Sequence, residues 1–400
     1  MIQIAVLGFG TVGAGVGRVL TENAAAVSRR IGEEVFLKSI LDPRPLKEPE
    51  WAEKQVSDFS VIENDPEITI VVETIGGVGA ALDFTRRALK KGKHVVTSNK
   101  ELVAQHGQEL LALAKERGVR YLFEASVGGG IPILHPLRQC LCANELTQVT
   151  GILNGTTNYI LTRMIRAGAS FEEALGEAQQ KGYAERDPSA DIEGRDACRK
   201  ICILASLCFG RHLLPHQVPT VGITGVTEQD VACGKAAGCR VKLLGRAVKG
   251  EDGRVCAFVE PHFVPEADPL SGVEDVFNAI SVTGNAIGDV MFYGRGAGAM
   301  PTASAVVSDV MELARGGDTG PALCWNEGGD DWVASPAAFA TAWCVRVKGE
   351  LAPPRGWRSL AWDEPGESVL VTPPLTADAL HANLGTVRIL AAYRILSPQA

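Results

Sequence analysis

The distribution of apolar positions divides the chain into three regions. In residues 1–130, short apolar runs rich in β-branched residues alternate with segments whose apolar positions recur every three or four residues. This alternation predicts a doubly wound parallel sheet. The predicted strands are Ile2–Leu7, Val35–Leu41, Ile68–Val72, His94–Thr97 and Arg120–Glu124, and the predicted helices pass through Val16, Val19 and Leu20 and cover Leu82–Lys90 and Glu101–Arg117.

Residues 131–300 follow a different pattern, in which strands and helices no longer alternate strictly. This arrangement is typical of an α+β domain. The predicted strands are Gln148–Leu153, Val241–Val248 and Cys256–Val259, and the predicted helices are Leu134–Leu141, Tyr159–Arg166, Phe171–Lys181 and Arg195–Leu207.

The last region begins with a helix predicted over Ala303–Arg315, with Pro301 just before it. We expect this helix, at about 301–315, to complete the first domain (1–130). A flexible stretch, Gly316–Asp331, separates the α+β domain (131–300) from a small C-terminal segment (335–400). The elements predicted there are strands Ala340–Lys348, Ser368–Thr372 and Arg388–Leu396 and helix Thr376–Leu384.

A glycine-rich turn, Gly8-Phe9-Gly10-Thr11-Val12-Gly13, connects the first strand to the first helix. The order of strand, glycine turn and helix is that of a dinucleotide-binding unit, in which the backbone approaches a pyrophosphate at a helix N-terminus. Asp42 ends the second strand, where an acid binds an adenine ribose hydroxyl and favours NAD. Arg44 is placed to meet the 2′-phosphate of NADP instead, so the two signals conflict. The long gap between the glycines and Asp42 predicts an extended first helix or loop.

Composition narrows the possible functions. The chain has 400 residues, 46% of them hydrophobic and 22% charged, as expected of a soluble protein with two or three domains. A net charge of −8 and few aromatic residues argue against nucleic acid as a partner. The sequence has neither a membrane-length apolar run nor a signal peptide, so we expect a cytoplasmic protein. The ten cysteines form no C-x-x-C motif and are expected to be buried thiols in a reducing compartment.

Three polar segments are candidates for chemistry. Lys200 lies one helical turn after Asp196, which suits either a buried acid–base lysine with its orienting carboxylate or an ordinary exposed ion pair. The acids Glu185, Asp187 and Asp191 suit either a substrate ammonium group or a solvated, capping loop. Two further polar groups are the Asn99-Lys100 pair, near the cofactor end of the sheet, and the 154–158 turn (NGTTN), which either caps a helix or holds a substrate.

Two glycine clusters interrupt the pattern. The segment from Gly128 to Pro132 is predicted to be an exposed hinge or a backbone-lined site between domains, and 294–298 (GRGAG) is predicted as a loop.

Six motifs in order resemble those of homoserine dehydrogenases over roughly residues 1–315: GFGTVG, TSNKELVA, FEASVGGGIPIL, GILNGTTNYIL, GYAERDPSADIEGRDACRK and GRGAGAMPTASAVVSD. The resemblance implies NAD(P)-dependent interconversion of L-homoserine and L-aspartate 4-semialdehyde in threonine and methionine biosynthesis. It implies a Rossmann-type nucleotide-binding domain, an α+β catalytic and dimerisation domain, and a homodimer or higher homo-oligomer. The alternatives are another amino-acid semialdehyde or hydroxy-acid dehydrogenase, and a non-catalytic nucleotide sensor on the same scaffold.

The resemblance also assigns roles to particular residues. It implies that Lys200 donates the proton and that Asp196 is catalytic and substrate-binding. It places Glu185, Asp191, Asp196 and Lys100 on the substrate. The cofactor contacts that it implies are Gly8, Gly10, Thr11, Val12, Gly13, Thr74, Lys100 and Gly298. A structural monovalent cation (sodium-type) site is carried over onto Glu124, Val127, Gly129 and Ile131.

Two features depart from the family pattern. Leu41 stands where many members have an arginine before the acid, which weakens the case for NADP. The C-terminal segment resembles an ACT-type regulatory unit (β-α-β-β-α-β), but Gly349–Glu367 is short and holds three prolines, so little room is left for its first helix. We therefore expect a degenerate ACT-like segment without a working effector site.

Overall fold

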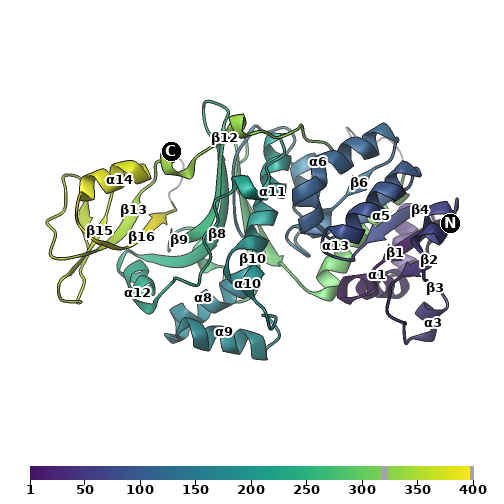
Figure 1. Cartoon of the computed structure of the whole chain (residues 1–400), viewed down its shortest axis with the longest axis horizontal. Coiled ribbons are helices and arrows are strands. Elements are labelled where there is room, and N and C mark those ends of the chain that lie inside the picture. The colour runs from purple at the N-terminus through teal and green to yellow at the C-terminus, as the bar shows by residue number, and fades with distance from the viewer. Residues whose placement is uncertain (317–322, 397–400) are drawn as a thin grey trace.

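The first sheet is built from six parallel strands in the order β3-β2-β1-β4-β5-β6. The computed structural model describes residues 1–316 and 323–396, and the sheet forms one end of an elongated molecule (Figure 1). The predicted parallel sheet is therefore confirmed. Its strands are β1 (Ile2–Leu7), β2 (Val35–Leu41), β3 (Gln55–Val56), β4 (Ile68–Glu73), β5 (His94–Thr97) and β6 (Tyr121–Leu122).

Helices pack around this sheet because each presents a buried apolar face. The helix α2 explains the long gap before Asp42. The helix α13 returns from far along the chain and packs against α1, where Ala303 approaches Gly15 closely. The helices are α1 (Thr11–Glu22), α2 (Ala24–Ile31), α3 (Pro49–Ala52), α4 (Phe59–Asn64), α5 (Gly79–Lys90), α6 (Lys100–Glu116) and α13 (Ala299–Ala314).

A second, mixed sheet occupies the middle and the other end of the molecule (Figure 1). Its strand order is β11-β10-β7-β8-β9-β16-β13-β15-β14, with β12 paired to β9. The first five of these strands are β7 (Leu146–Ile152), β8 (Cys239–Lys249), β9 (Val255–Pro265), β10 (Phe277–Gly284) and β11 (Gly288–Arg295).

The helix α11 is the central element between the two sheets. Its buried residues, among them Ile201 and Leu204, pack on the second sheet, and its other neighbours include α6 of the first. This packing brings the N-terminal ends of α6 and α11 together. The helices of this region are α7 (Leu134–Gln139), α8 (Gly155–Ala167), α9 (Phe171–Gln180), α10 (Ser189–Ile192), α11 (Arg195–Phe209) and α12 (Glu228–Ala236).

The C-terminal segment extends the second sheet. Its strand β16 pairs in parallel with β9 and antiparallel with β13. Residues 349–366, all of which the structure describes, contain the short strand β14 and no helix, in accord with the predicted lack of room. The elements are β12 (Val333–Ala334), β13 (Trp343–Lys348), β14 (Arg358–Ser359), β15 (Glu367–Val371), α14 (Ala377–Leu384) and β16 (Ile389–Ile395).

Several sequence predictions need correction. The helix α13 begins at Ala299, so Pro301 lies inside its first turn, where an amide N–H has no intrahelical acceptor. The strand predicted to end at Glu124 is only two residues long, because Glu124 begins a 3-10 turn. The strands β10 and β11 were not predicted, and the predicted 294–298 loop overlaps the end of β11. Part of the predicted flexible stretch, 317–322, lies outside the described residues.

The glycine bend at 128–130 is packed at its first two residues, whereas Gly130 is exposed. Gly128 and Gly129 are buried, and a Cβ on Gly129 would lie 2.4 Å from the carbonyl oxygen of Gly296. Gly130 likewise lies against Pro301, in the first turn of α13. The bend therefore holds the connection between the sheets against α13. Of the two predictions for this segment, a packed bend favours the backbone-lined site.

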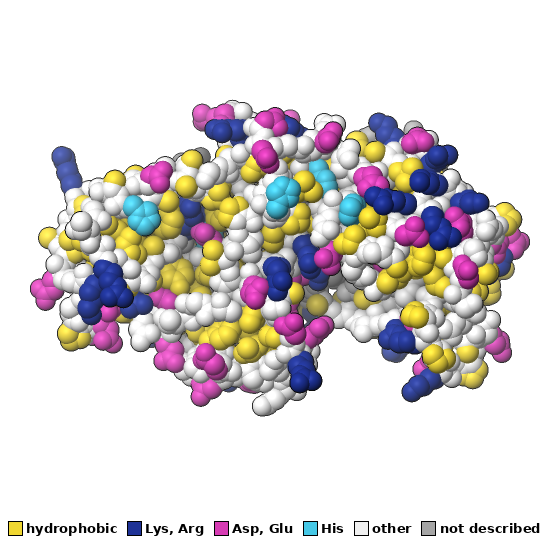
Figure 2. All heavy atoms as spheres, viewed as in Figure 1, with side chains coloured by type: hydrophobic (Ala, Val, Ile, Leu, Met, Phe, Trp, Pro, Cys, Tyr) yellow, Lys and Arg dark blue, Asp and Glu magenta, His cyan; other side chains and the backbone are white. Residues whose placement is uncertain are grey.

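The ten cysteines are all free thiols. Six are buried and Cys208 is partly buried, as expected, but Cys140, Cys142 and Cys324 are exposed, contrary to the prediction. Figure 2 shows a face on which basic and acidic side chains are interspersed. Among the described residues, none of the helices is both long and apolar enough to span a membrane.

Trp325 joins the two halves of the molecule. Its ring lies 5.6 Å from that of Phe123, which follows β6, and 5.7 Å from that of His212, which follows α11. His212 in turn contacts the backbone oxygen of Ala104 in α6 at 2.9 Å. Trp325 therefore fills the space where α6, β6 and the end of α11 meet.

We expect Trp325→Ala to destabilise the protein by about 3–5 kcal/mol, because it leaves a large cavity at this junction. Urea unfolding followed by circular dichroism measures the change. Val61→Ala is the control, since Val61 is 51% exposed and its truncation should have little effect. Equal stability of the two variants would contradict the role given to Trp325.

Candidate active site

The glycine turn after β1 is tightly constrained. Gly8 has a φ of +83°, and its N–H donates to the Leu41 oxygen at 2.8 Å. A Cβ on Gly13 would lie 2.1 Å from the Gly8 oxygen. The Thr74 hydroxyl donates to the same oxygen at 2.7 Å. These contacts hold the backbone at the start of α1 in a conformation that only glycine permits at Gly8.

The first turn of α1 has unused donors. The N–H groups of Thr11, Val12 and Gly13 have no intrahelical acceptor because they form the first turn, and Gly10 before them offers no side-chain cap. Such a helix end attracts a phosphate through its free N–H groups and its dipole. The predicted pyrophosphate-binding turn therefore has the required geometry.

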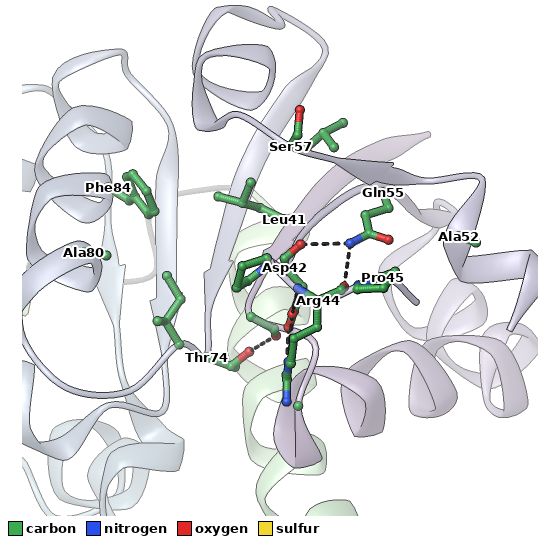
Figure 3. A pocket seen from close by; sticks show the side chains of 15 residues that line it. Leu41, Asp42, Arg44, Pro45, Ala52, Gln55, Ser57, Thr74, Ala80 and Phe84 are labelled. Atoms are coloured by element: carbon green, nitrogen blue, oxygen red, sulfur yellow. Dashed lines mark hydrogen bonds and ion pairs between the residues drawn. The ribbon is translucent and has the colours of Figure 1, made fainter. Parts of the chain in front are cut away.

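A cavity of about 1010 Å³ opens beside this turn. Figure 3 shows that Leu41 and Asp42 come from the end of β2, while Phe84 lies across the cavity on α5. Of the residues predicted to contact the cofactor, Gly8, Gly10 and Thr74 line it. The remaining predicted contacts, Thr11, Val12, Gly13, Lys100 and Gly298, do not line this cavity as the structure describes it, and Gly298 precedes α13.

The acid at the end of β2 is engaged by its neighbours. The carboxylate of Asp42 accepts two guanidinium donors of Arg44 at 3.0 Å (Figure 3). It also accepts the N–H of Phe9 at 2.7 Å. The hydrogen bond from Arg44 is the main cause that lowers the pKa of Asp42 to about 2. The side chain of Gln55 fixes this turn through the oxygens of Asp42 and Arg44. Asp42, which favours NAD, and Arg44, which favours NADP, are therefore the two members of one ion pair.

A second polar centre lies where α6 meets α11. The two carboxylate oxygens of Asp196 contact Lys100 Nζ at 2.6 Å and Lys200 Nζ at 2.8 Å. Lys200 also donates to the Leu153 oxygen at 2.7 Å. Asp196 and Lys200 are both buried, so the exposed ion pair that spacing alone allowed is wrong.

Burial and charge set the protonation of this centre. Burial lowers the pKa of Lys200 below its usual value, although Asp196 opposes the shift. Burial would raise the pKa of Asp196, but the two ammonium groups outweigh it and hold that pKa well below its usual range. Lys100 is partly exposed, and the attraction of Asp196 outweighs burial and raises its pKa. Lys200 is therefore the lysine that loses its proton more readily.

The acidic segment before α11 divides into different roles. Asp191 shares the amide of Asn154 with Asp196, so the structure brings it to the lysine centre. Asp187 accepts the Ser189 N–H at 3.1 Å, a local contact in the loop before α10. Glu185 is exposed, and among the described residues no hydrogen bond or ion pair reaches its side chain. The structure thus places Asp191, but not Glu185, in contact with this centre.

Two contacts at this centre were missed from sequence. Arg199 forms a 2.8 Å ion pair with Glu101, parallel to the pair between Lys100 and Asp196. The only sequence signal for this ion pair was position, since Glu101 directly follows Lys100 and Arg199 directly precedes Lys200. Asn154 was expected either to cap a helix or to hold substrate, and it does cap α8, but its amide also reaches both aspartates.

Glu124 lies in the bend between the sheets. Its carboxylate accepts the N–H groups of Ile133 at 2.6 Å, Leu134 at 3.0 Å and His135 at 2.6 Å. It therefore caps the start of α7. Burial raises the pKa of Glu124. In the described part of the chain, no hydrogen bond reaches the backbone oxygens of the other predicted cation ligands, Val127, Gly129 and Ile131.

Comparison with known proteins assigns the glycine turn and the lysine centre to two domains of one enzyme family. The family model for the homoserine dehydrogenase NAD-binding domain matches residues 8–124, and that for homoserine dehydrogenase matches residues 132–311. A Bacillus subtilis homoserine dehydrogenase is 43% identical over 326 residues, which are 80% of this chain and 75% of the relative. The chain belongs to the homoserine dehydrogenase family.

Other relatives agree. A Synechocystis homoserine dehydrogenase is 44% identical over 80% of this chain and 76% of its own length. The crystal structure of a Thiobacillus denitrificans homoserine dehydrogenase has a TM-score of 0.88 at 34% identity, covering 100% of this chain and 99% of that one. A hyperthermophilic archaeal homoserine dehydrogenase in complex with NADPH has a TM-score of 0.65 at 28% identity, covering 78% and 97% of the two chains.

Membership of the homoserine dehydrogenase family establishes the reaction. The chain is an NAD(P)-dependent oxidoreductase that acts on a CH–OH group and interconverts L-homoserine and L-aspartate 4-semialdehyde, a reaction of amino-acid biosynthesis. These relatives select homoserine dehydrogenase over the other dehydrogenases and the nucleotide sensor that the sequence alone left open.

We expect Gly13→Ala to weaken NADH binding roughly ten- to hundredfold, because the added methyl group overlaps the Gly8 oxygen and displaces the turn. Titration of NADH fluorescence measures the dissociation constant. Gly176→Ala in α9 is the matched control, since a Cβ at that position would meet nothing within 4 Å. An unchanged dissociation constant in Gly13→Ala would contradict the assignment of this turn.

Proposed function

We propose that Lys200 is the acid–base group of the reaction and that Asp196 holds it in place. The observation that carries this proposal is the shared carboxylate of Asp196, which contacts the ammonium groups of Lys100 and Lys200. A general acid or base works best when its pKa lies near the operating pH. Burial moves the pKa of Lys200 in that direction.

The bound nicotinamide cofactor supplies the hydride acceptor or donor. The residues of the chain then have separate tasks. Lys200 gives a proton to the aldehyde oxygen when homoserine forms, and takes the hydroxyl proton in the reverse direction. Asp191 and Glu185 bind the α-ammonium group of the substrate, and Lys100 would contact the substrate and the cofactor from the side of Asp196. Exposure of Glu185 leaves its carboxylate available to a ligand.

We propose that the pocket accepts both NAD and NADP, with Arg44 as the residue that favours NADP. Asp42 is ionised at neutral pH and suits a ribose hydroxyl. The guanidinium of Arg44 is 71% exposed and lies close to Gly10, so it can turn from Asp42 to a phosphate. This arrangement compensates in part for Leu41, which stands in place of an arginine.

We propose a structural monovalent cation site at Glu124 and the backbone oxygens of Val127, Gly129 and Ile131. A hard monovalent cation takes oxygen ligands, and these three oxygens have no other partner among the described residues. Glu124 accepts three N–H groups, so its carboxylate retains acceptor capacity for a cation. The site would fix the bend between the two sheets.

We further propose a homodimer, or a higher homo-oligomer, formed through the α+β region. The strand β11 is the edge of the second sheet and exposes apolar side chains, with Met291 39% and Tyr293 53% exposed. An exposed apolar edge strand is normally covered by a partner. We place this assembly in the cytoplasm, which suits the free cysteines.

We propose the domain division 1–130 with helix 301–315, 131–300, and 335–400. The sheet order supports the division between the first two, and β16 joins the third to the second. The order β16-β13-β15-β14 is that of a β-α-β-β-α-β unit without its first helix. This supports a degenerate ACT-like segment without a working effector site.

We expect Lys200→Ala to lower kcat by roughly 10²–10⁴-fold, because the reacting oxygen loses its proton donor. An NADPH absorbance assay with L-aspartate 4-semialdehyde measures turnover, and NADPH fluorescence should show unchanged cofactor binding. Lys249→Ala, at an exposed position at the end of β8, is the control. Near-normal turnover of the Lys200 variant would reject the assignment.

We expect Arg44→Ala to lower kcat/KM with NADP by about tenfold or more and with NAD much less, because only NADP has the 2′-phosphate. Steady-state kinetics with both cofactors measure the ratio. Arg29→Ala removes an exposed arginine of α2 and should leave the ratio unchanged. Equal losses with both cofactors would show that Arg44 does not select the phosphate.

A further inference from the structure

Asn154 lies between β7 and α8, and its side chain has two separate contact sets. Its Oδ1 accepts the N–H of Thr157 at 2.8 Å and the Thr157 hydroxyl at 3.1 Å. Its Nδ2 donates to Asp191 Oδ1 at 2.7 Å and to Asp196 Oδ2 at 2.9 Å. The cap at Thr157 fixes the orientation of the amide, because the flipped amide would turn an oxygen toward two carboxylates.

The two aspartates need such a donor because they lie close together. Both accept hydrogen bonds from the one NH₂ group, and like charges at this separation disfavour ionisation. Asp196 is compensated by the ammonium groups of Lys100 and Lys200. Asp191 has no ion pair within 4.0 Å among the described residues. Its charge is stabilised first by the amide of Asn154, at 2.7 Å, and then by the side chain of Thr156 and the attraction of Lys200.

The same turn also holds the lysine. The backbone oxygen of Leu153, the preceding residue, accepts from Lys200 Nζ at 2.7 Å. Leu153 and Asn154 thus fix both members of the Lys200–Asp196 pair from the end of β7. The sequence from Leu153 to Thr157 therefore couples the cap of α8 to the geometry of the reacting centre.

We infer that Asn154 is a positioning residue, whose amide keeps Asp196 on the two lysines and keeps Asp191 ionised for the ammonium group of an amino-acid substrate. This inference rests on the proposed function, in which Lys200 carries the proton and Asp191 binds the substrate. It adds that a neutral donor standing between the two aspartates helps both carboxylates to share the site.

The ionisation of Asp191 makes substrate binding depend on pH. The charged groups that face Asp191 are Asp196 and Lys200 from α11 and Lys100 from α6. Burial raises the pKa of Asp191, Asp196 raises it further, and the hydrogen bond from Asn154 opposes both. The ionised form is present above that pKa and is lost as the pH falls through it. Loss of the Asn154 amide should therefore move the acidic limb of kcat/KM to higher pH.

The test variant is Asn154→Ser in the full-length enzyme. A serine still accepts the Thr157 N–H as an N-cap, so α8 is retained while the NH₂ donor is lost. We expect KM for L-homoserine to rise roughly tenfold or more, with a smaller change in kcat, since buried acceptors lose their donor. The acidic limb of kcat/KM should move to higher pH, and NADPH affinity should stay unchanged.

Asn154→Asp is the second variant. It also retains the cap, but it adds a third carboxylate beside Asp191 and Asp196. We expect it to lower kcat/KM at neutral pH more than Asn154→Ser does, because like charges repel in a buried site. An aspartate variant with the kinetics of the unmodified enzyme would overturn the inference.

Two controls separate a positioning role from a structural one. Thr227→Ala removes the N-cap of α12, away from the site, and should lower the melting temperature without moving the acidic limb. If Asn154→Ser likewise lowers only the melting temperature, Asn154 is a helix cap and the inference is wrong. If Lys200→Ala retains turnover, the proposed function fails, whereas a dead Lys200→Ala beside an unaffected Asn154→Ser overturns the role of Asn154 alone.

Discussion

The buried carboxylate of Asp196 is the interaction on which the arrangement of the active centre depends. It holds Lys100 from α6 and Lys200 from its own helix, α11. A buried charge is costly unless it is paired, so the centre is stable only when both helix ends lie side by side. The ion pair between Arg199 and Glu101 crosses the same junction. The reacting groups therefore come together only when the elements of the two sheets pack against each other.

A second set of buried acids fixes the bend that connects the two sheets. Glu124 caps α7, and its own N–H donates to Asp309 of α13 at 2.8 Å. Glu312, one turn later on α13, pairs with Arg120 and His135. Burial raises the pKa of both Glu124 and Asp309. The return of α13 to the first sheet is thus tied to the bend through side-chain contacts as well as apolar packing.

Most of the fold could be predicted from periodicity, because buried strands and amphipathic helices leave local patterns. The bounds of β1, β2 and β5 were predicted to the residue. The strands β10 and β11 were both missed, and β11 is a weak signal because its apolar residues lie on an exposed edge strand. Pro301 suggested a helix beginning at Ala303, four residues too late, because its missing N–H suits any residue of a first helical turn.

For the site, the sequence by itself determined the Lys200–Asp196 pair, because an i,i+4 spacing places both on one helix face. It also determined the glycine turn, because the glycines stand in sequence between the first strand and the first helix. The resemblance to the family then indicated which residues were candidates for binding the substrate and the cofactor. Only the tertiary structure decided that Asp196 also holds Lys100, that Asn154 joins Asp191 to Asp196, and that the Glu185 side chain is exposed. The reason is that these contacts join residues far apart in the chain, and their geometry depends on how α6, α8 and α11 pack together.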